Sequence, residues 1–276
     1  MSRIQNILDK AEREGAVRRI RPIADPAMAG VAAVEAPTTF IPPAGAAAEA
    51  QVSAEPEAIA SSRVISGARL SPRLISAVAP GGVAAEQYRA LRTRIAHTET
   101  GGAVNVLLVT SPARGDGKSL TVANLGLAMA QEYQQRICVV DADLRASQQH
   151  RLFGLQDSPG LSDVLTGAAS LEEALVTVEE HHITVLPVGS PSAHPAELLG
   201  TTTMRRVLES LRSRFDRIII DAPAATPLAD VGVLAPLVDS VILVVRAGVT
   251  SKPAIHDAIG AIDAGKLLGI VLNEAA

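Results

Sequence analysis

Short apolar runs rich in β-branched residues alternate with helical stretches through the second part of the chain, and this alternation constrains the fold most strongly. The runs predict strands over residues 104–110, 137–142, 183–188, 217–222, 240–246 and 268–273. The stretches between them predict helices over residues 119–131, 171–176, 196–214, 228–237 and 253–262. Because apolar strands separated by helices form parallel sheets covered on both faces, the pattern predicts an α/β fold with a doubly wound, mainly parallel sheet.

The composition supports this architecture and excludes other classes of protein. Of the 276 residues, 47% are apolar but only 2% are aromatic, so the core must be built from small aliphatic side chains. The net charge of -4 provides no general basic surface, and we expect no nucleic-acid partner. No run reaches the roughly 18 apolar residues of a membrane span, so a soluble, cytoplasmic protein is expected. The single cysteine, Cys138, lies in an apolar run and is expected to be buried.

The region before the predicted sheet divides into two segments. Apolar residues at helical spacing predict a short amphipathic helix within residues 1–20. Residues 22–62 contain no Lys or Arg and are rich in Ala and Pro, a composition typical of linkers. The expected organisation is therefore the N-terminal helix, a disordered N-terminal linker over 21–70 and one domain over 71–276.

A glycine-rich loop directly follows the first predicted strand. It is Ser-Pro-Ala-Arg-Gly-Asp-Gly-Lys-Ser over residues 111–119, and it leads into a predicted helix. Glycines let consecutive backbone N–H groups turn toward phosphate oxygens, while the helix N-terminus and Lys118 add positive charge. Ser119 is then a ligand for Mg²⁺. The alternative is an ordinary helix N-terminus with an exposed lysine, because Pro112 stands where the strict pattern has glycine.

The loop predicts a P-loop NTPase fold that binds ATP and Mg²⁺. The candidate nucleotide-binding residues are Arg114, Gly115, Asp116, Gly117, Lys118, Ser119 and Leu120. Asp141, Asp143 and Asp221 follow or end two other predicted strands, and ligands bind at the carboxyl ends of parallel strands. There the three carboxylates can hold Mg²⁺ or its waters and orient a hydroxyl nucleophile. Simple helix caps or turn formers are the alternative.

Further strings support one particular family. They lie, in order, at residues 86–93, 143–145, 150–155, 160–165 and 195–199. Together with the loop and the aspartates, they resemble the bacterial tyrosine kinases of capsule and exopolysaccharide export, relatives of the MinD and ParA ATPases. The resemblance spans most of the chain. The first string, Glu-Gln-Tyr-Arg-Ala-Leu-Arg-Thr, is similar to the Glu-x-x-Arg-x-x-Arg oligomerisation motif of that family.

The resemblance implies roles for individual residues. Lys118 would contact the β and γ phosphates of ATP, and Ser119 would bind Mg²⁺ together with Asp141 and Asp221. Asp141 and Asp143 would form a second acidic motif beside the transferred phosphoryl group. Lys118 and the three aspartates are therefore the candidate catalytic residues.

Two more contacts follow from the resemblance, and each has a simpler alternative. Asn273 would recognise adenine, unless it is only a turn residue at the end of a strand. Glu86, Arg89 and Arg92 follow one another at i, i+3 and i+6 on a helix and would contact another copy, which predicts a homo-oligomer. A solvated helix face with local ion pairs, each worth about 0.3 kcal/mol, is the alternative.

The tyrosines depart from the family pattern. Many members end in a tyrosine cluster that is autophosphorylated in trans, whereas this sequence ends Leu-Asn-Glu-Ala-Ala, and its two tyrosines are Tyr88 and Tyr133. Residues 146–149 also lack the regulatory tyrosine of some relatives. We therefore expect no autophosphorylation on a tyrosine cluster. Either this protein phosphorylates a tyrosine on another protein, or its kinase activity has been lost.

Three functions remain open. The first is a tyrosine kinase at the inner face of the plasma membrane that works with a separate membrane protein controlling polysaccharide chain length. The N-terminal helix would dock to that partner, lie on anionic lipid or pack on itself. The second is a MinD- or ParA-like switch, although Ala113 replaces the additional lysine of those proteins and Arg114 follows it. The third is a scaffold that binds nucleotide without turnover.

Overall fold

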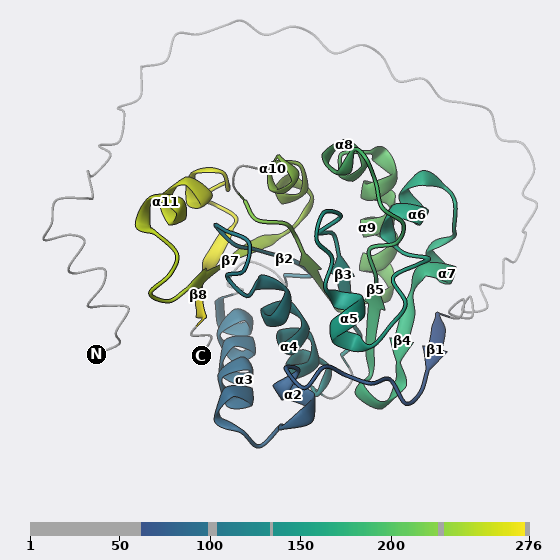
Figure 1. Ribbon diagram of the computed structural model, residues 1–276, viewed down its shortest axis with the longest axis horizontal. Coiled ribbons are helices and arrows are strands. Elements are labelled where there is room, and N and C mark those ends of the chain that lie inside the picture. Colours follow the sequence, from purple (N-terminus) through teal and green to yellow (C-terminus); the bar gives the residue numbers. More distant parts are fainter. Residues whose placement is uncertain (1–61, 99–103, 133–134, 226–228, 274–276) are drawn as a thin grey trace, which may run out of the picture. The chain divides into compact units, whose positions relative to one another are not determined.

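The structure is a computed structural model that describes residues 62–98, 104–132, 135–225 and 229–273 (Figure 1). Within these residues the strands form one eight-stranded sheet with the order β1-β4-β5-β3-β6-β2-β7-β8. The strands are β1 (Arg63–Ile65), β2 (Val106–Thr110), β3 (Ile137–Asp141), β4 (Val176–Val178), β5 (Ile183–Leu186), β6 (Arg217–Asp221), β7 (Ser240–Arg246) and β8 (Leu267–Asn273). β4 pairs antiparallel with β5 and every other neighbouring pair is parallel, so β1 and β4 run against the other six strands.

Helices cover both faces of the sheet (Figure 1). One face carries α2 (Ile75–Val78), α3 (Val83–Thr98), α4 (Lys118–Ala130) and α5 (Gln149–Phe153). The other carries α6 (Leu161–Thr166), α7 (Leu171–Ala174), α8 (Pro195–Leu199), α9 (Thr202–Arg214), α10 (Asp230–Leu234) and α11 (Lys252–Gly260). Two 3-10 turns, η1 (Glu179–His181) and η2 (Ala235–Leu237), complete the described elements. The predicted doubly wound, mainly parallel fold is therefore confirmed.

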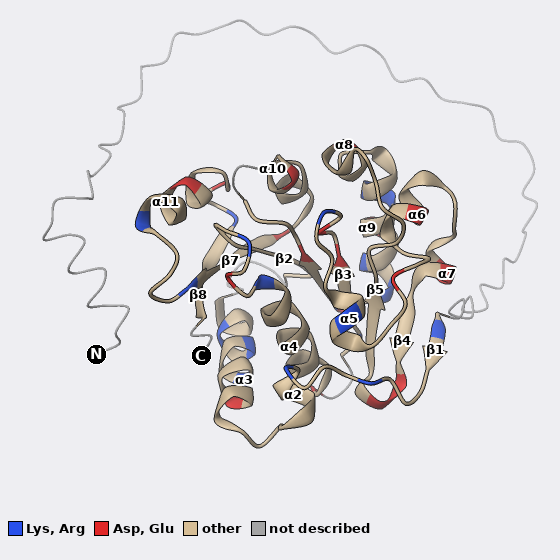
Figure 2. Cartoon of the chain, viewed as in Figure 1, with Lys and Arg blue, Asp and Glu red and all other residues tan. Residues whose placement is uncertain are grey.

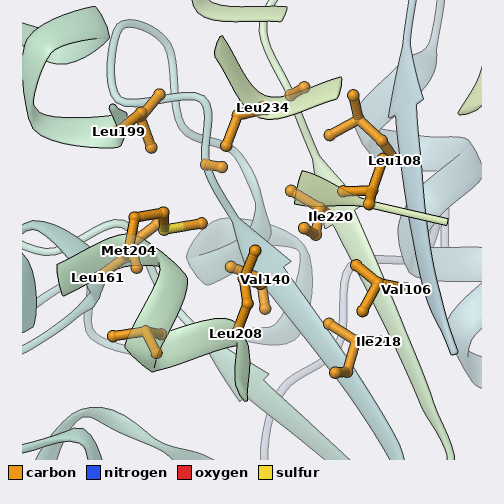
Figure 3. Packing of buried hydrophobic residues seen from close by; sticks show 14 of the residues in the cluster. Val106, Leu108, Val140, Leu161, Leu199, Met204, Leu208, Ile218, Ile220 and Leu234 are labelled. Atoms are coloured by element: carbon orange, nitrogen blue, oxygen red, sulfur yellow. The ribbon is translucent and has the colours of Figure 1, made fainter. Parts of the chain in front are cut away.

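The side chains of the central strands divide between two cores because successive residues of a strand point to opposite faces. In β2, Val106 and Leu108 join the core that includes α9, while Leu107 and Val109 join the core that includes α4. Figure 3 shows part of the first of these cores, in which the labelled side chains are aliphatic apart from Met204. Cys138 is buried, as predicted.

A glycine brings α4 close to the sheet. A Cβ atom on Gly126 would lie 2.8 Å from Cγ2 of Val139 and 3.1 Å from Cδ1 of Ile183. These distances are shorter than ordinary van der Waals contacts, so only glycine fits here without displacement of its neighbours. The close approach fixes the position of α4, and with it the loop at the N-terminus of the helix.

All six predicted strands form, but the far edge of the sheet differs from the prediction. The helix predicted over 171–176 ends at Ala174, and the β-branched segment Val176–Val178 instead forms β4 between β1 and β5. The linker predicted over 21–70 also ends too late, because the backbone N–H of Arg63 donates to the carbonyl of Leu175 at 3.0 Å as β1 joins the sheet. The predicted N-terminal helix and the linker before residue 62 lie outside the described residues.

The long helix predicted over 196–214 is two helices. Gly200 and Thr201 separate α8 from α9, and the Thr201 hydroxyl accepts a hydrogen bond from the Met204 N–H at 3.3 Å. This contact caps α9 and starts a new helix, because a side-chain acceptor satisfies one of its free backbone donors. The predicted helix over 228–237 is likewise divided into α10 and η2.

Candidate functional site

The glycine-rich loop connects β2 to α4 through two glycines in the left-handed region. Gly115 and Gly117 have φ angles of 95° and 98°, which residues with a Cβ atom rarely adopt. A Cβ atom on Gly117 would also lie 2.0 Å from Nδ2 of Asn273. Of the other predicted loop residues, Arg114 is exposed and Leu120 is half-buried. The loop therefore has the backbone conformation that a phosphate cradle needs, directly ahead of a helix N-terminus.

Asp116 and Asn273 brace this loop from within the protein. The Asp116 carboxylate accepts hydrogen bonds from the Ala113 N–H at 2.9 Å and the Thr250 hydroxyl at 2.8 Å. Asn273 donates through Nδ2 to the Asp116 carbonyl oxygen at 2.9 Å. The structure thus brings Asn273 from the end of β8 to the loop. The Asp116 side chain is buried and binds the protein's own groups.

Lys118 begins α4 and points into a cluster of carboxylates. It is only 7% exposed, and its Nζ lies 2.6 Å from Oδ2 of Asp143 and 3.4 Å from Oδ1 of Asp221. The same ammonium donates to the hydroxyl of Ser119 at 3.3 Å. Lys118 is therefore not the exposed lysine of an ordinary helix N-terminus. The structure brings the loop and the ends of β3 and β6 together, as the sequence predicts.

Asp141 and Asp143 also shape the turn that follows β3. Oδ2 of the buried Asp141 accepts hydrogen bonds from the backbone N–H groups of Gln148 at 3.1 Å and Gln149 at 3.0 Å. Its Oδ1 accepts from the N–H of Asp143 at 3.2 Å, and Asp143 accepts from the N–H of Ala146 at 3.0 Å. The turn-forming role considered as an alternative is real, and it places both carboxylates in the cluster.

The cluster has unusual electrostatics because its charges are withdrawn from water. Burial raises the pKa of Asp141 to about 8, and the nearby Asp221 acts in the same direction. Burial also raises the pKa of Asp221, although Lys118 and Gln149 oppose this change. For Lys118, burial alone would lower the pKa, but Asp221 and Asp143 outweigh it and the pKa is raised. Three carboxyl groups thus surround one ammonium, and a bound cation would oppose the burial and mutual repulsion that raise the pKa values of Asp141 and Asp221.

Sequence reasoning missed two contributors. The Gln149 side chain donates through Nε2 to Oδ2 of Asp221 at 2.8 Å and to the Ser119 carbonyl at 3.0 Å. The buried Asp230 pairs with Arg145 at 3.0 Å and ties the turn after β3 to α10. Gln149 belongs to no sequence motif that indicates a functional site. For Asp230, the only available signal was the opposite charge of Arg145.

The cluster fits a magnesium ion bound together with phosphate groups. Within the described residues, no three His, Cys, Asp or Glu side chains are arranged to enclose a metal ion by themselves. In nucleotide sites, however, Mg²⁺ takes only one or two carboxylates and completes its shell with water and phosphate oxygens. The Ser119 hydroxyl beside Lys118 and the carboxylate of Asp221 supply these ligand types. The residues present therefore suit Mg-ATP.

The charged residues predicted to contact another copy lie on α3 (Figure 2). Arg89 pairs with Glu86 and donates to the Pro80 carbonyl of its own chain. Arg92 donates to the Ala128 carbonyl in the last turn of α4 at 2.7 Å. The local ion pair expected in the simpler alternative is thus present. The contact between copies stays a prediction.

Comparison with known proteins identifies the family to which this site belongs. The family model described as an AAA domain matches residues 105–264. Tyrosine-protein kinase YwqD of Bacillus subtilis (strain 168) is 33% identical over 209 residues, which cover 75% of this chain and 88% of the relative. The chain belongs to the bacterial tyrosine kinases of the capsule and exopolysaccharide type.

Solved structures agree with this family. The kinase domain of the Escherichia coli tyrosine kinase ETK matches with a TM-score of 0.71 at 28% identity, covering 75% of this chain and 82% of that one. The septum site-determining protein MinD of Pyrococcus horikoshii OT3, complexed with Mg-ADP, matches with a TM-score of 0.50 at 25% identity, covering 61% and 70%. The bacterial tyrosine kinases are thus ATP-dependent phosphotransferases on a P-loop fold related to MinD. None of the described helices is long and apolar enough to cross a bilayer.

Proposed function

We propose that this member of the family is an active protein-tyrosine kinase that uses Mg-ATP. The observation that carries the proposal is the buried cluster of Lys118, Asp141, Asp143 and Asp221 beside a loop whose glycines are turned for phosphate binding. Each buried carboxylate destabilises the fold unless it is paired or hydrogen-bonded. Beyond the turn that Asp141 and Asp143 form, phosphoryl transfer needs carboxylates here to hold Mg²⁺ and orient the nucleophile, whereas nucleotide binding alone does not.

Each member of the cluster has a separate task in this proposal. The loop backbone and the α4 N-terminus bind the phosphates, and Lys118 neutralises the β and γ groups. Ser119, Asp141 and Asp221 hold Mg²⁺, which when bound neutralises phosphate charge. Asp143 orients the acceptor hydroxyl and accepts its proton.

Two peripheral contacts belong to the same proposal. Asn273 contacts adenine, and its hydrogen bond to the Asp116 carbonyl keeps its carboxamide beside the nucleotide loop. Glu86, Arg89 and Arg92 contact a second copy of the chain, which makes the kinase a homo-oligomer. Both assignments rest on the family resemblance and on the position of these residues in the fold.

The acceptor tyrosine is proposed to lie on another protein. Tyr88 is half-buried on α3, burial raises the pKa of its phenol, and its hydroxyl bonds to Thr121. It is therefore a poor substrate, and Tyr133 lies outside the described residues. We further propose that the target belongs to a membrane assembly for capsule or exopolysaccharide export. That assembly includes a separate chain-length protein, which holds the kinase at the inner face of the plasma membrane.

A nucleotide-driven switch without kinase activity is the second candidate. The observation in its favour is the link from the loop to the segment before α11, where Thr250 donates to Asp116. A change in the loop on nucleotide binding would reach that surface through this hydrogen bond. Ala113, which replaces the additional lysine of MinD- and ParA-like proteins, weighs against it.

Phosphotyrosine mapping separates the two candidates. The chain is purified from its own cells beside Lys118→Met, Ser119→Ala and the exposed control Lys252→Met, with folding checked by circular dichroism. Phosphotyrosine on co-purifying membrane proteins should be present with the wild type and Lys252→Met and lost with the other two variants. If the wild type hydrolyses ATP but yields no phosphotyrosine on any protein, the kinase proposal fails and the switch replaces it.

A further inference from the structure

Gln149 connects the three parts of the site. It is fully buried at the start of α5, and its backbone N–H donates to Asp141 at the end of β3. Its side-chain Nε2 donates to Oδ2 of Asp221 at the end of β6 and to the carbonyl of Ser119 in the first turn of α4. One residue thus contacts both acidic motifs and the helix that carries the phosphate loop.

The partners of Gln149 fix the orientation of its carboxamide. A carboxylate and a backbone carbonyl only accept hydrogen bonds, so the NH₂ group must face them, and both of its N–H bonds are used. This leaves Oε1 buried and without a hydrogen-bond partner among the described residues. A buried unmet acceptor costs about 1–3 kcal/mol, so fold stability alone does not explain a glutamine at this position.

We propose that Gln149 is a positioning residue for the magnesium-nucleotide site. By holding Oδ2 of Asp221, it directs the other carboxylate oxygen toward Lys118 and the proposed magnesium position. By holding the carbonyl of Ser119, it fixes the backbone of the residue whose hydroxyl is proposed to bind the ion. The inference rests on the proposed use of Mg-ATP and assigns to Gln149 a role exerted through Asp221 and Ser119.

Asn124 provides a matched comparison for a buried amide with a structural role only. It is fully buried on α4, accepts a hydrogen bond from the Ser76 N–H at 3.0 Å and donates to the carbonyls of Arg73 and Leu120, each at 3.1 Å. These bonds hold the segment of α2 against α4, and none of them reaches the carboxylate cluster. Loss of either amide should reduce stability, but only loss of the Gln149 amide should change the response to magnesium.

The test measures binding of a fluorescent ATP analogue over a series of Mg²⁺ concentrations. Gln149→Met keeps the side-chain length but removes both N–H donors, and Gln149→Asn keeps the amide one methylene too short to reach both partners. In each variant the Mg²⁺ concentration for half-maximal binding should rise about 10- to 100-fold, as when an outer-shell partner of a metal ligand is lost. Binding without Mg²⁺ should stay close to wild type, and Asn124→Leu should keep the wild-type magnesium response.

Equal weakening with and without Mg²⁺, or the same magnesium shift in Asn124→Leu, would overturn the positioning role. If Gln149→Met does not fold, as judged by circular dichroism, Gln149→Asn carries the same test. The assay measures binding and not transfer, so its failure is distinct from failure of the kinase proposal. A wild type that binds Mg-ATP but phosphorylates no protein would end the kinase proposal and leave the role of Gln149 standing.

Discussion

Replacement of Lys118 by methionine is the most informative perturbation of the cluster. The substitution keeps an unbranched side chain of similar length but removes the one ammonium that the described structure places between Asp143 and Asp221. The carboxylates then remain buried without a counter-charge. We therefore expect the chain without nucleotide and Mg²⁺ to lose stability, in addition to losing function.

The magnitude follows from the two short distances. With an effective dielectric constant of about 20, the ammonium is attracted by about 6 kcal/mol to Asp143 at 2.6 Å and by about 5 kcal/mol to Asp221 at 3.4 Å. Desolvation of the buried ions offsets several kcal/mol of this attraction. Removal of one partner from a buried ion pair usually costs about 3–5 kcal/mol, and we expect Lys118→Met to lose that amount at pH 8.

The loss depends on pH in a definite direction. Burial raises the pKa of Asp141 to about 8, so between about pH 4 and pH 8 the folded chain holds a proton that the unfolded chain releases. In this window the free energy of unfolding falls as the pH rises. Lys118 lowers the pKa of Asp141 and of Asp221, so without its ammonium these two pKa values rise further and the variant loses stability more steeply. The difference from wild type should be smaller at pH 6 than at pH 8.

Urea denaturation followed by circular dichroism at pH 6 and pH 8 measures this difference. Lys252→Met, at an exposed position of α11, is the control for loss of a lysine and should match wild type. The double variant Lys118→Met with Asp143→Asn should recover part of the loss, because one uncompensated carboxylate is removed. Exposed ion pairs contribute up to about 1 kcal/mol. The buried cluster would be refuted if Lys118→Met lowered the free energy of unfolding by less than this at pH 8, or by an amount that did not depend on pH.

Three further predictions concern packing and charge around the site. Gly126→Val should lower stability by about 1–3 kcal/mol because its side chain meets Val139, and an unchanged melting temperature would contradict the close approach of α4. Burial raises the pKa of the Cys138 thiol and shields it, so iodoacetamide should label it in urea but not in the native chain. Mass spectrometry measures the labelling, and rapid labelling of the native chain would count against burial of the thiol. Asp230→Asn should lower the free energy of unfolding in urea by about 1 kcal/mol, because it weakens the ion pair with the partly exposed Arg145. The decrease should be smaller at high salt, and a decrease that salt does not change would indicate a packing effect instead.

The features predicted correctly from the sequence are those encoded locally. A strand, a glycine-rich loop and a helix follow one another directly in the chain, so the phosphate loop between Thr110 and Lys118 can be recognised from its own residues. The aspartates at the ends of β3 and β6 are found in the same way, because parallel strands bring their carboxyl ends to one edge. The fold and the cluster of Lys118 with the aspartates can therefore be predicted from short sequence motifs.

The features that were missed depend on distant parts of the chain. The Gln149 side chain is defined by contacts with residues 30 and 72 positions away, and nothing near it in the sequence marks that role. Val176–Val178 is an edge strand of three residues, too short for an alternating pattern, and it follows a helix started by the capping box of Ser170 and Glu173. Its place in the sheet is set by β1 and β5, which lie elsewhere in the chain.

If Arg92 contacts another copy as proposed, its hydrogen bond to Ala128 links that contact to α4. One of the five guanidinium N–H donors makes this bond, so a neighbouring copy that draws the side chain away would remove the donor from the carbonyl in the last turn of α4. The same helix begins at Lys118 and spans 13 residues, a rigid rod of about 20 Å. Contact with a neighbouring copy would therefore change the hydrogen bonding at the C-terminal end of α4, and the N-terminal end of the same helix carries Lys118 of the phosphate site.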